Sequence, residues 1–255
     1  MLSKNELKYY SSLLVKKFRG EENKFIVEGK KIIEEALQSK FKCELIFVTK
    51  EFAKKEKRYL NTIPNEIRIE ELNNAEFKKL KSTVSPQGIA AVFSKAIKSI
   101  KDIVEAKKNP LVCLDNISDP GNLGTILRNC DWFGFQDILL TENCTELFSP
   151  KTIRASMGSV FHLNIREDIS LTDITNLKKK GYKIFCADLN GENLYSINFE
   201  NNSILVFSNE ANGPSPEILN LSDKKITIPS YGKAESLNVA SASAVILSQI
   251  RKKII

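Results

Sequence analysis

Short apolar runs that favour β-strands alternate with helical patterns along almost the whole sequence. The run "PLVCLDNI" at residues 110–117 is nearly continuous in apolar residues, which is typical of a strand buried on both faces of a parallel sheet. Strands that alternate with helices form layered folds, in which helices cover the faces of the sheet. The alternation therefore restricts the chain to the α/β class.

The alternation occurs in two series, separated by a charged segment. In the first series we expect strands at 24–29, 43–49, 67–70 and 88–94, and helices at 3–18, 30–39, 51–60 and 75–82. In the second series we expect strands at 110–117, 137–141, 182–188, 203–210 and 224–230, and helices at 122–134, 150–161, 171–181 and about 236–253.

Two domains of different charge are expected. The chain has 255 residues and 42% hydrophobic content, enough for two modest cores. The charged stretch "KAIKSIKDIVEAKKN" ends before Pro110, so we expect domains at 1–95 and 110–255 with a linker at 96–109. The first 108 residues contain 24 Lys plus Arg and 15 Asp plus Glu, whereas the remainder contains 14 and 16. All of the net positive charge therefore lies in the first half.

This charge asymmetry has two explanations. Lys and Arg neutralise phosphates and release counterions, so a basic domain suits a polyanion such as nucleic acid. A lysine-rich surface also keeps a protein soluble without any partner. Charge alone favours neither explanation.

The cysteines and the apolar segments exclude several classes of protein. Five cysteines are scattered without a CxxC pair or a histidine cluster. We therefore expect no metal site, no disulfide framework and a reducing cytoplasm. The N-terminus lacks the apolar core of a signal peptide, and no apolar run is long enough to span a bilayer. These features predict a soluble cytoplasmic protein.

Common catalytic motifs are absent. There is no G-x-G and no G-x-x-x-x-G-K-[ST], which disfavours dinucleotide chemistry and nucleotide hydrolysis. There is no G-x-S-x-G either, and a Ser-His-Asp hydrolase would have to use His162, the sole histidine. Because His162 follows a predicted helix in "GSVFHLNI", we expect it to be a packed structural residue.

Polar groups follow three predicted strands of the second half. In the first segment, "DNISDPGNLGTILRN", Gly121 and Gly124 predict a turn into a helix whose N-terminus favours anions. An ordinary βα turn explains the glycines as well. Asn122 and Arg128 offer planar donors that suit phosphate or carboxylate.

The second segment, "LVFSNEANGPSPEI" at 205–218, leads an apolar strand directly into Asn209 and Glu210. Ligands of α/β proteins usually lie at this edge of the sheet. A turn at Asn212 and Gly213 explains part of the segment but leaves Glu210 unexplained.

The third segment, "IPSYGKAESLNVASASAVIL" at 228–247, combines a glycine turn with a helix of small residues. Glu235, Ser236 and Asn238 stand at the front of this helix, and an N-cap accounts for only one of them. The Ala and Ser body lets another backbone approach closely, from the same chain or from a partner subunit. The remaining polar side chains are candidates for ligand binding.

Taken in order, these segments resemble the SpoU/TrmH family of S-adenosylmethionine-dependent RNA ribose 2'-O-methyltransferases, part of the SPOUT superfamily. "NLGTILRNCDWFGF" is similar to the first family motif, "LVFSNEANGPS" to the second and "IPSYGKAESLNVASASAVIL" to the third. "SPKTIRASMGSVFHL" is similar to the segment that follows the first motif, and "KFIVEGKKIIEEAL" to the substrate-binding domain that many members carry. The resemblance covers nearly the whole chain.

The resemblance implies a small N-terminal α/β RNA substrate-binding domain and a SPOUT α/β methyltransferase domain with a C-terminal trefoil knot. It also implies a homodimer, S-adenosylmethionine as cofactor and RNA as the methyl acceptor. An attached basic domain is similar to the arrangement in ribosomal RNA enzymes, so we expect ribosomal RNA. The alternatives are 2'-O-methylation of transfer RNA, methylation of a base, and a catalytically inactive RNA-binding member.

Carried over position by position, the resemblance implies two sets of site residues. The catalytic set is Asn122, Arg128, Glu210, Ser236 and Asn238. The cofactor-binding set is Ser208, Ile228 and Leu237, acting largely through backbone groups. Two positions depart from the family, which usually has Gly in place of Ser208 and often Met in place of Ser230. A side chain at position 208 predicts modestly weaker cofactor binding if the backbone there needs a positive φ.

Overall fold

The computed structural model describes residues 2–95, 110–209 and 213–254, so the predicted linker at 96–109 and Glu210 lie outside the described residues. The chain forms two compact units. The first contains the described residues up to Lys95 together with Phe148–Phe161, and the second contains the other described residues. The sequence analysis places 148–161 in the second domain, whereas their contacts group them with the first unit.

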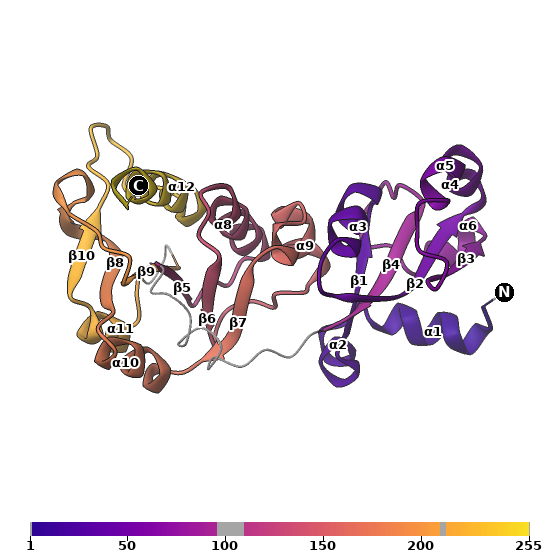
Figure 1. Ribbon diagram of the computed structural model, residues 1–255, viewed down its shortest axis with the longest axis horizontal. Coiled ribbons are helices and arrows are strands. Elements are labelled where there is room, and N and C mark those ends of the chain that lie inside the picture. The colour runs from indigo at the N-terminus through magenta and orange to yellow at the C-terminus, as the bar shows by residue number, and fades with distance from the viewer. Residues whose placement is uncertain (1, 96–109, 210–212, 255) are drawn as a thin grey trace. The chain divides into compact units, whose positions relative to one another are not determined.

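The first unit is a four-stranded sheet with short helices (Figure 1). Strand β4 is antiparallel to β1 and β2, and β2 is parallel to β3, in the order β1-β4-β2-β3. The strands are β1 (Lys24–Glu28), β2 (Lys42–Thr49), β3 (Arg68–Leu72) and β4 (Ile89–Ser94). The helices are α1 (Lys4–Ser12), α2 (Lys16–Glu22), α3 (Lys30–Leu37), α4 (Lys50–Lys55), α5 (Lys57–Leu60), α6 (Asn74–Phe77) and α9 (Pro150–Ser156), with a 3-10 turn at Ser159–Phe161.

Aromatic packing explains why residues 148–161 belong to the first unit. The ring of Phe25 in β1 stacks on that of Phe148, with centroids 4.4 Å apart and an interplanar angle of 19°. Phe161 lies within 6.2 Å of the same ring. Offset stacking of this kind adds to the apolar area that the rings remove from water. Phe25 is fully buried by these contacts.

The second unit is a six-stranded sheet in which all strand pairs are parallel, in the order β10-β8-β9-β5-β6-β7. The strands are β5 (Leu111–Asp115), β6 (Asp137–Thr141), β7 (Asn164–Ile169), β8 (Lys183–Asn193), β9 (Ser203–Ser208) and β10 (Lys224–Thr227). The helices are α8 (Pro120–Trp132), α10 (Leu171–Lys179), α11 (Pro216–Leu221) and α12 (Val239–Ile254), with a 3-10 turn at Leu194–Ser196.

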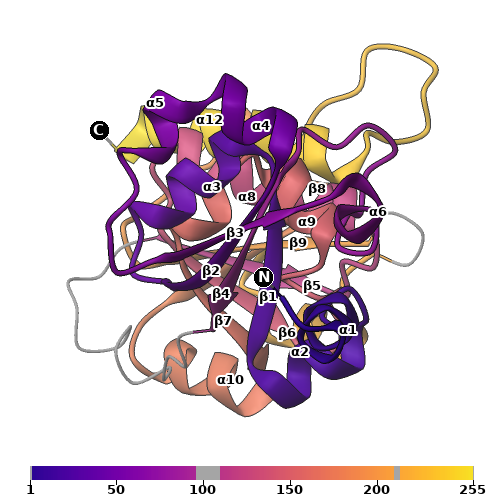
Figure 2. The same ribbon diagram turned by 90° about the vertical axis from the view of Figure 1, so that its right-hand side faces the viewer.

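Helices cover both faces of this sheet, α8 and α12 on one and α10 and α11 on the other (Figures 1 and 2). Residues that alternate along the strands, such as Cys113 and Val206, pack with Ile174 of α10 and Ile218 of α11. The strand β5 is buried along its whole length, as its continuous apolar sequence predicts. The predicted α/β class is therefore confirmed.

Several element boundaries differ from the predictions. The single helix expected at 3–18 is two helices, because Val15 adopts an extended backbone between them. The helix expected at 51–60 is likewise divided into α4 and α5. Strand β7 and helix α11 were not expected, and both are short segments with weak periodicity. Helix α12 begins at Val239 instead of near 236. No helix in the described part of the chain is both long and apolar enough to cross a membrane.

Candidate active site

The carboxyl ends of the strands in the second unit form a single edge, because the strands are parallel. The chain leaves β5 toward β6 and β7 on one side, and only later forms β8, β9 and β10 on the other. The connections diverge on either side of the β5–β9 pair, and such a switch point is where α/β sheets usually bind ligands. Asp115 and Ser208 are paired in register at this point.

A buried carboxylate ties together the loops that leave this edge. Asp115 is 3% exposed and accepts hydrogen bonds from Ser215 N at 2.8 Å and Thr141 Oγ1 at 3.2 Å. Asn209 Nδ2 donates to Ser118 Oγ at 3.0 Å, which is a second link between the loops after β9 and β5. Asp115 was not among the predicted site residues, although an acidic residue at the end of a buried apolar strand is visible in the sequence.

Helix α8 begins earlier than the glycine pair suggested. Its N-cap is Asp119, whose Oδ1 accepts a hydrogen bond from Asn122 N at 2.9 Å. Gly121 and Gly124 lie inside the helix, so the predicted glycine turn is wrong. The turn precedes the helix, where Asn116 adopts a positive φ of 56°. Asparagine is enriched among residues with this backbone conformation.

The first and third motifs meet through two asparagines. Asn238 Nδ2 donates to Asn122 Oδ1 at 3.0 Å, and Asn238 Oδ1 accepts from Ala240 N at 2.9 Å. Asn238 therefore caps helix α12, and it is the one of the three polar residues at the front of this helix that an N-cap explains. Both ends of its amide are held, so these bonds fix the orientation of its side chain.

Helices α8 and α12 pack closely along the small residues of α12. Asn129 Nδ2 of α8 donates to Ala240 O and to Ser243 Oγ, each at 2.9 Å. Ser243 is fully buried. The predicted close approach of a second backbone is confirmed, and this backbone belongs to the same chain.

Arg128 and Ser236 are not tied to the asparagine pair. Arg128 is exposed on α8, and its guanidinium makes no hydrogen bond or ion pair with any described residue. Ser236 is exposed and its hydroxyl is equally unpaired within the described ranges. An arginine left with its planar donors in solvent is ready to bind a phosphate in two-point fashion.

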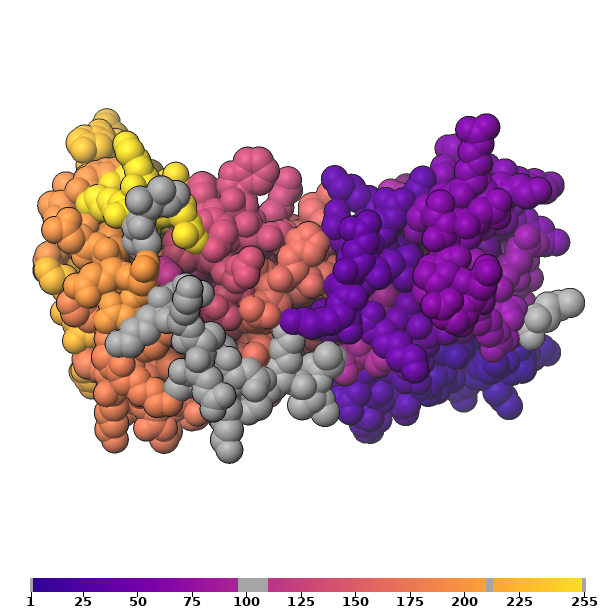
Figure 3. Space-filling model, in the orientation of Figure 1, coloured from indigo at the N-terminus to yellow at the C-terminus, as the bar shows by residue number. Residues whose placement is uncertain are grey.

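The loop between β10 and α12 carries most of the third motif. Residues 230–238 are exposed, and the loop projects from the second unit (Figures 2 and 3). Within the described chain, the backbone groups of 229–237 make no hydrogen bonds with other backbone groups. Ile228 is half-buried and Leu237 is 48% exposed. The loop thus offers backbone donors and acceptors beside apolar side chains, which fits the adenine and the polar tail of S-adenosylmethionine.

Ser208 does not carry the backbone strain that its replacement of glycine suggested. It is the last residue of β9, is 7% exposed, and does not have a positive φ. A side chain at this position therefore costs no left-handed backbone strain. The expected loss of cofactor affinity on that ground has no support in the geometry.

The single histidine is not packed in the core. The side chain of His162 is 41% exposed, and its Nδ1 lies 2.9 Å from Asp131 Oδ2 on α8. The prediction of a packed residue is wrong, because the sequence does not reveal that Asp131 lies across from the histidine. This pair is a surface contact and supplies no nucleophile.

The cysteines of the second unit are unsuited to covalent catalysis. Burial raises the pKa of Cys186 to about 12 and raises that of Cys113 well above its ordinary value. Burial also raises the pKa of Cys144, whose thiol donates to Leu114 O at 3.1 Å. The reactive form of cysteine is the thiolate, which these sites suppress at neutral pH. Nucleophilic catalysis by these thiols is therefore disfavoured at this edge.

The sequence pattern of the SpoU rRNA Methylase family matches residues 109–248, and that of the MRM3-like substrate binding domain matches residues 4–91. The first match covers more than half of the chain and contains the β5–β9 pair, the asparagine pair and Arg128. The chain belongs to the SpoU rRNA methylase family.

Individual relatives agree with this assignment. The chain is 32% identical over 251 residues to the 23S rRNA (guanosine(2553)-2'-O)-methyltransferase RlmP of Bacillus subtilis, covering 98% of this chain and 97% of that protein. It is 29% identical to the tRNA (guanosine(18)-2'-O)-methyltransferase of Aquifex aeolicus, covering 64% of this chain and 78% of that protein. The crystal structure of an AdoMet-bound rRNA methyltransferase from Sinorhizobium meliloti is 28% identical, with a TM-score of 0.87 and coverage of 100% and 97%.

Proposed function

We propose that this protein transfers the methyl group of S-adenosylmethionine to a ribose 2'-hydroxyl of ribosomal RNA. The hydrogen bond between Asn122 and Asn238 carries the proposal, because it joins the first and third family motifs at the carboxyl edge. The relative that acts on 23S ribosomal RNA matches almost the entire chain, so both units have a counterpart in it. Transfer RNA is the second candidate, supported by the relative that matches 64% of the chain.

Ser208, Ile228 and Leu237 are the residues that would hold the cofactor, mainly through backbone groups of the exposed loop. When bound, the cofactor supplies an electrophilic methyl group on a sulfonium. The protein then has to hold the 2'-oxygen in line with this methyl and keep water away from it.

Arg128 has the main part in activating the hydroxyl. A guanidinium keeps its proton under nearly all conditions in proteins, so it does not act as the base. We assign it to the phosphate beside the target ribose, where it positions the hydroxyl and stabilises the developing negative charge on oxygen. The proton passes to a phosphate oxygen or to water.

The remaining residues position the ribose. Asn238 and Ser236 orient the hydroxyl, while Asn122 holds the amide of Asn238 in place. Glu210, outside the described residues, has the predicted role of shaping the pocket. We also retain the homodimer, the trefoil knot and the cytoplasmic location as proposals that follow from the family.

Methyl transfer to isolated RNA tests the function. The protein is mixed with labelled S-adenosylmethionine and with total ribosomal RNA or total transfer RNA from cells that lack it, and the modified nucleotide is mapped. One 2'-O-methylated site in ribosomal RNA is expected. A site in transfer RNA contradicts the choice of substrate, and cofactor binding without transfer to either RNA contradicts the choice of RNA class. Absence of both binding and transfer supports an inactive RNA-binding protein.

A further inference from the structure

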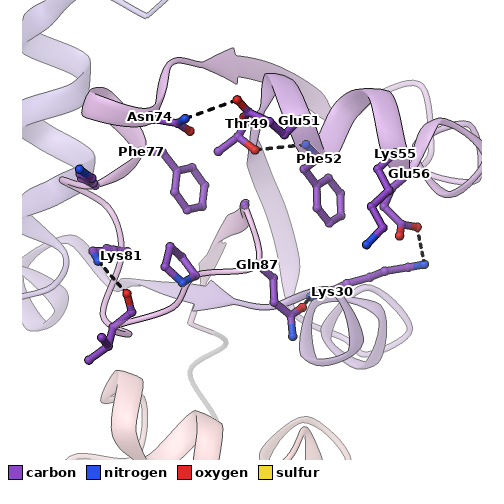
Figure 4. A pocket seen from close by; sticks show the side chains of 14 residues that line it. Lys30, Thr49, Glu51, Phe52, Lys55, Glu56, Asn74, Phe77, Lys81 and Gln87 are labelled. Carbon is purple, nitrogen blue, oxygen red and sulfur yellow. Dashed lines mark hydrogen bonds and ion pairs between the residues drawn. The ribbon is translucent and has the colours of Figure 1, made fainter.

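The first unit contains a cleft of about 740 Å³ at the carboxyl end of β2 (Figure 4). Helix α4 and helix α6 form two of its walls, and residues 84–88 form a third. We propose that this cleft binds an unpaired stretch of the substrate RNA, with phosphates on its lysines and a base inside it. The inference rests on the proposed function for the identity of the polyanion as RNA. It adds where the RNA binds, in this cleft, and in which form, as an unpaired strand.

Residues 84–88, which form the third wall, belong to a segment (82–88) that is held in place at both of its ends. The carboxylate of Glu28 is 8% exposed and accepts hydrogen bonds from Ser82 N at 2.8 Å, from Ser82 Oγ at 2.9 Å and from Thr83 Oγ1. At the other end, Gly88 has a φ of +84°, and a Cβ there would lie 2.6 Å from Thr49 Oγ1. The cleft is therefore part of the folded structure and not a gap between loose side chains.

The charge left over in the cleft is positive. Its lining has four lysines and two glutamates. Glu56 pairs with Lys30 at 2.9 Å, and Glu51 accepts a hydrogen bond from the neutral amide of Asn74 at 3.4 Å, so three other lysines face one carboxylate whose charge is not cancelled. The ammonium groups of Lys55 and Lys78, by contrast, make no hydrogen bond or ion pair with any residue that the structure describes. Unpaired lysines on a rim are suited to backbone phosphates, which they bind as point charges.

The interior of the cleft suits a base. In the view of Figure 4, the rings of Phe52 and Phe77 lie on one side of the cleft and the amide of Gln87 lies on the other. Both residues are largely buried and contribute apolar surface to the lining of the cleft. Gln87 Oε1 accepts a hydrogen bond from Lys30 N at 3.0 Å, which leaves its NH₂ unpaired among the described residues. Side-chain amides read the hydrogen-bonding edges of splayed-out bases.

A double helix does not suit this arrangement. The bases of A-form RNA are stacked and paired, and side chains cannot read its deep, narrow groove. Only a base that has left the helical stack can reach the rings of Phe52 and Phe77 and the amide of Gln87 opposite them. Val84, whose side chain is 94% exposed at the rim, adds an apolar contact for a ribose or a neighbouring base.

Binding of short RNAs to the full-length protein tests the inference. The probes are a labelled single-stranded RNA of mixed sequence and the same RNA annealed to its complement, measured by fluorescence anisotropy at several salt concentrations. Lys55→Ala/Lys78→Ala is compared with Lys4→Ala/Lys8→Ala, which removes the same charge from exposed positions on α1, outside the cleft. Circular dichroism confirms that both proteins are folded.

The cleft variant is expected to bind the single strand about tenfold more weakly near physiological salt, with the salt slope reduced by about 1.4 for two lost phosphate contacts. The α1 variant is expected to change affinity less than about twofold. Gln87→Ala removes the amide that would contact the base, so it is expected to narrow the preference for single strand over duplex without changing the salt slope. Equal losses in the two lysine variants, or equal binding of duplex and single strand by the unmodified protein, overturn the inference.

Two further measurements separate this inference from the proposed function. Displacement of the labelled RNA by poly-glutamate as effectively as by unlabelled RNA identifies an acidic protein as the partner and overturns the nucleotide assignment. Cofactor binding and methyl transfer are measured in the same preparations. If the Lys55→Ala/Lys78→Ala protein binds RNA normally and the unmodified protein methylates RNA, the RNA-binding role of the cleft is refuted and the proposed function is not. Selective RNA binding by the cleft without any methyl transfer refutes the proposed function alone.

Discussion

The two polar sites of this protein differ in how their side chains are held. At the carboxyl edge of the six-stranded sheet, the amides of Asn122 and Asn238 are bonded to each other and to the start of a helix. In the cleft of the first unit, Lys55 and Lys78 have no partner in the described chain. Fixed neutral groups position a reacting atom, whereas unpaired charges attract a polyanion. The difference supports the proposed division between positioning and capture. Arg128 is the exception, because its charge has no partner among the described residues although we assign it to the proposed active site.

Removal of Arg128 is expected to have the largest effect. Arg128→Ala should lower kcat for methyl transfer by about 10²–10³-fold, because it removes a donor that stabilises developing charge. The affinity for RNA should change little, since one of many phosphate contacts is lost. Steady-state kinetics with the mapped RNA measures both quantities. Arg128→Lys keeps the charge without the planar fork, and full activity of this variant would contradict the two-point contact.

Two substitutions of Asn238 separate its capping role from its positioning role. Asn238→Asp keeps an acceptor for Ala240 N, so helix α12 should remain capped, but it loses the donor to Asn122. Asn238→Ala loses both bonds and about 1 kcal/mol of stability. Both variants should lose about 10²-fold in kcat through misplacement of the hydroxyl. If Asn238→Asp is as active as the unmodified protein, the asparagine pair has no positioning role.

Asp115→Ala should affect stability more than the lysine substitutions do. Its carboxylate accepts bonds from Ser215 N and Thr141 Oγ1, and loss of a bond to a charged group costs about 1.5–3 kcal/mol. Urea unfolding measures this loss, and calorimetry should show weaker cofactor binding because the loop after β9 is released. Thr141→Val is the matched control, since it removes one of the two donors and leaves the carboxylate. An equally stable Asp115→Ala protein would mean that the loops are held by other contacts.

The smallest effect is expected at the amino edge of the same sheet, where a carboxylate is purely structural. Burial raises the pKa of Asp223, but a hydrogen bond from Ile184 N and the ammonium of Lys178 outweigh it, so the pKa lies below its ordinary value of 3.8. A lowered pKa contributes stability above 3.8 that is lost as the pH falls through the folded-state pKa. Asp223→Asn should therefore be slightly less stable near neutral pH, and the difference should disappear in acid. If the stability difference between Asp223→Asn and the unmodified protein grows as the pH falls, the charged form of Asp223 is not what stabilises the fold.

Local patterns predicted most of the fold but few of the contacts at the site. Continuous apolar runs located β5 and β9, because the burial of a strand on both faces is visible in a few consecutive residues. Helix α11 was missed, since it is short and weakly periodic. The three motifs predicted that Asn122 and Asn238 belong to one site. Their direct hydrogen bond depends on how α8 and α12 pack, and this information is not local to either segment.

The cleft was also invisible in the sequence for a physical reason. Lys55 is the last residue of α4 and Lys78 is the C-cap of α6, and a count of basic residues does not distinguish them from other surface lysines. The buried carboxylate of Glu28 and the left-handed backbone of Gly88 shape the wall opposite, through contacts with residues far along the chain. Charge asymmetry left a polyanion partner and a solvated lysine-rich surface as alternatives, and the position of a candidate binding site is visible only in the folded unit.

The backbone of residues 229–237 has no backbone partner among the described residues, so this loop can report whether a ligand is bound. Amide hydrogens without an acceptor exchange with deuterated solvent at rates close to those of an unstructured peptide. The hydrogen-bonded amides of α12 and β9 exchange only when the structure opens locally, so they exchange more slowly. A ligand that takes these amides as donors slows their exchange directly. Mass spectrometry of the peptide that spans the loop therefore measures the fraction of protein with a ligand bound at this loop. The measurement does not depend on whether any methyl group has been transferred.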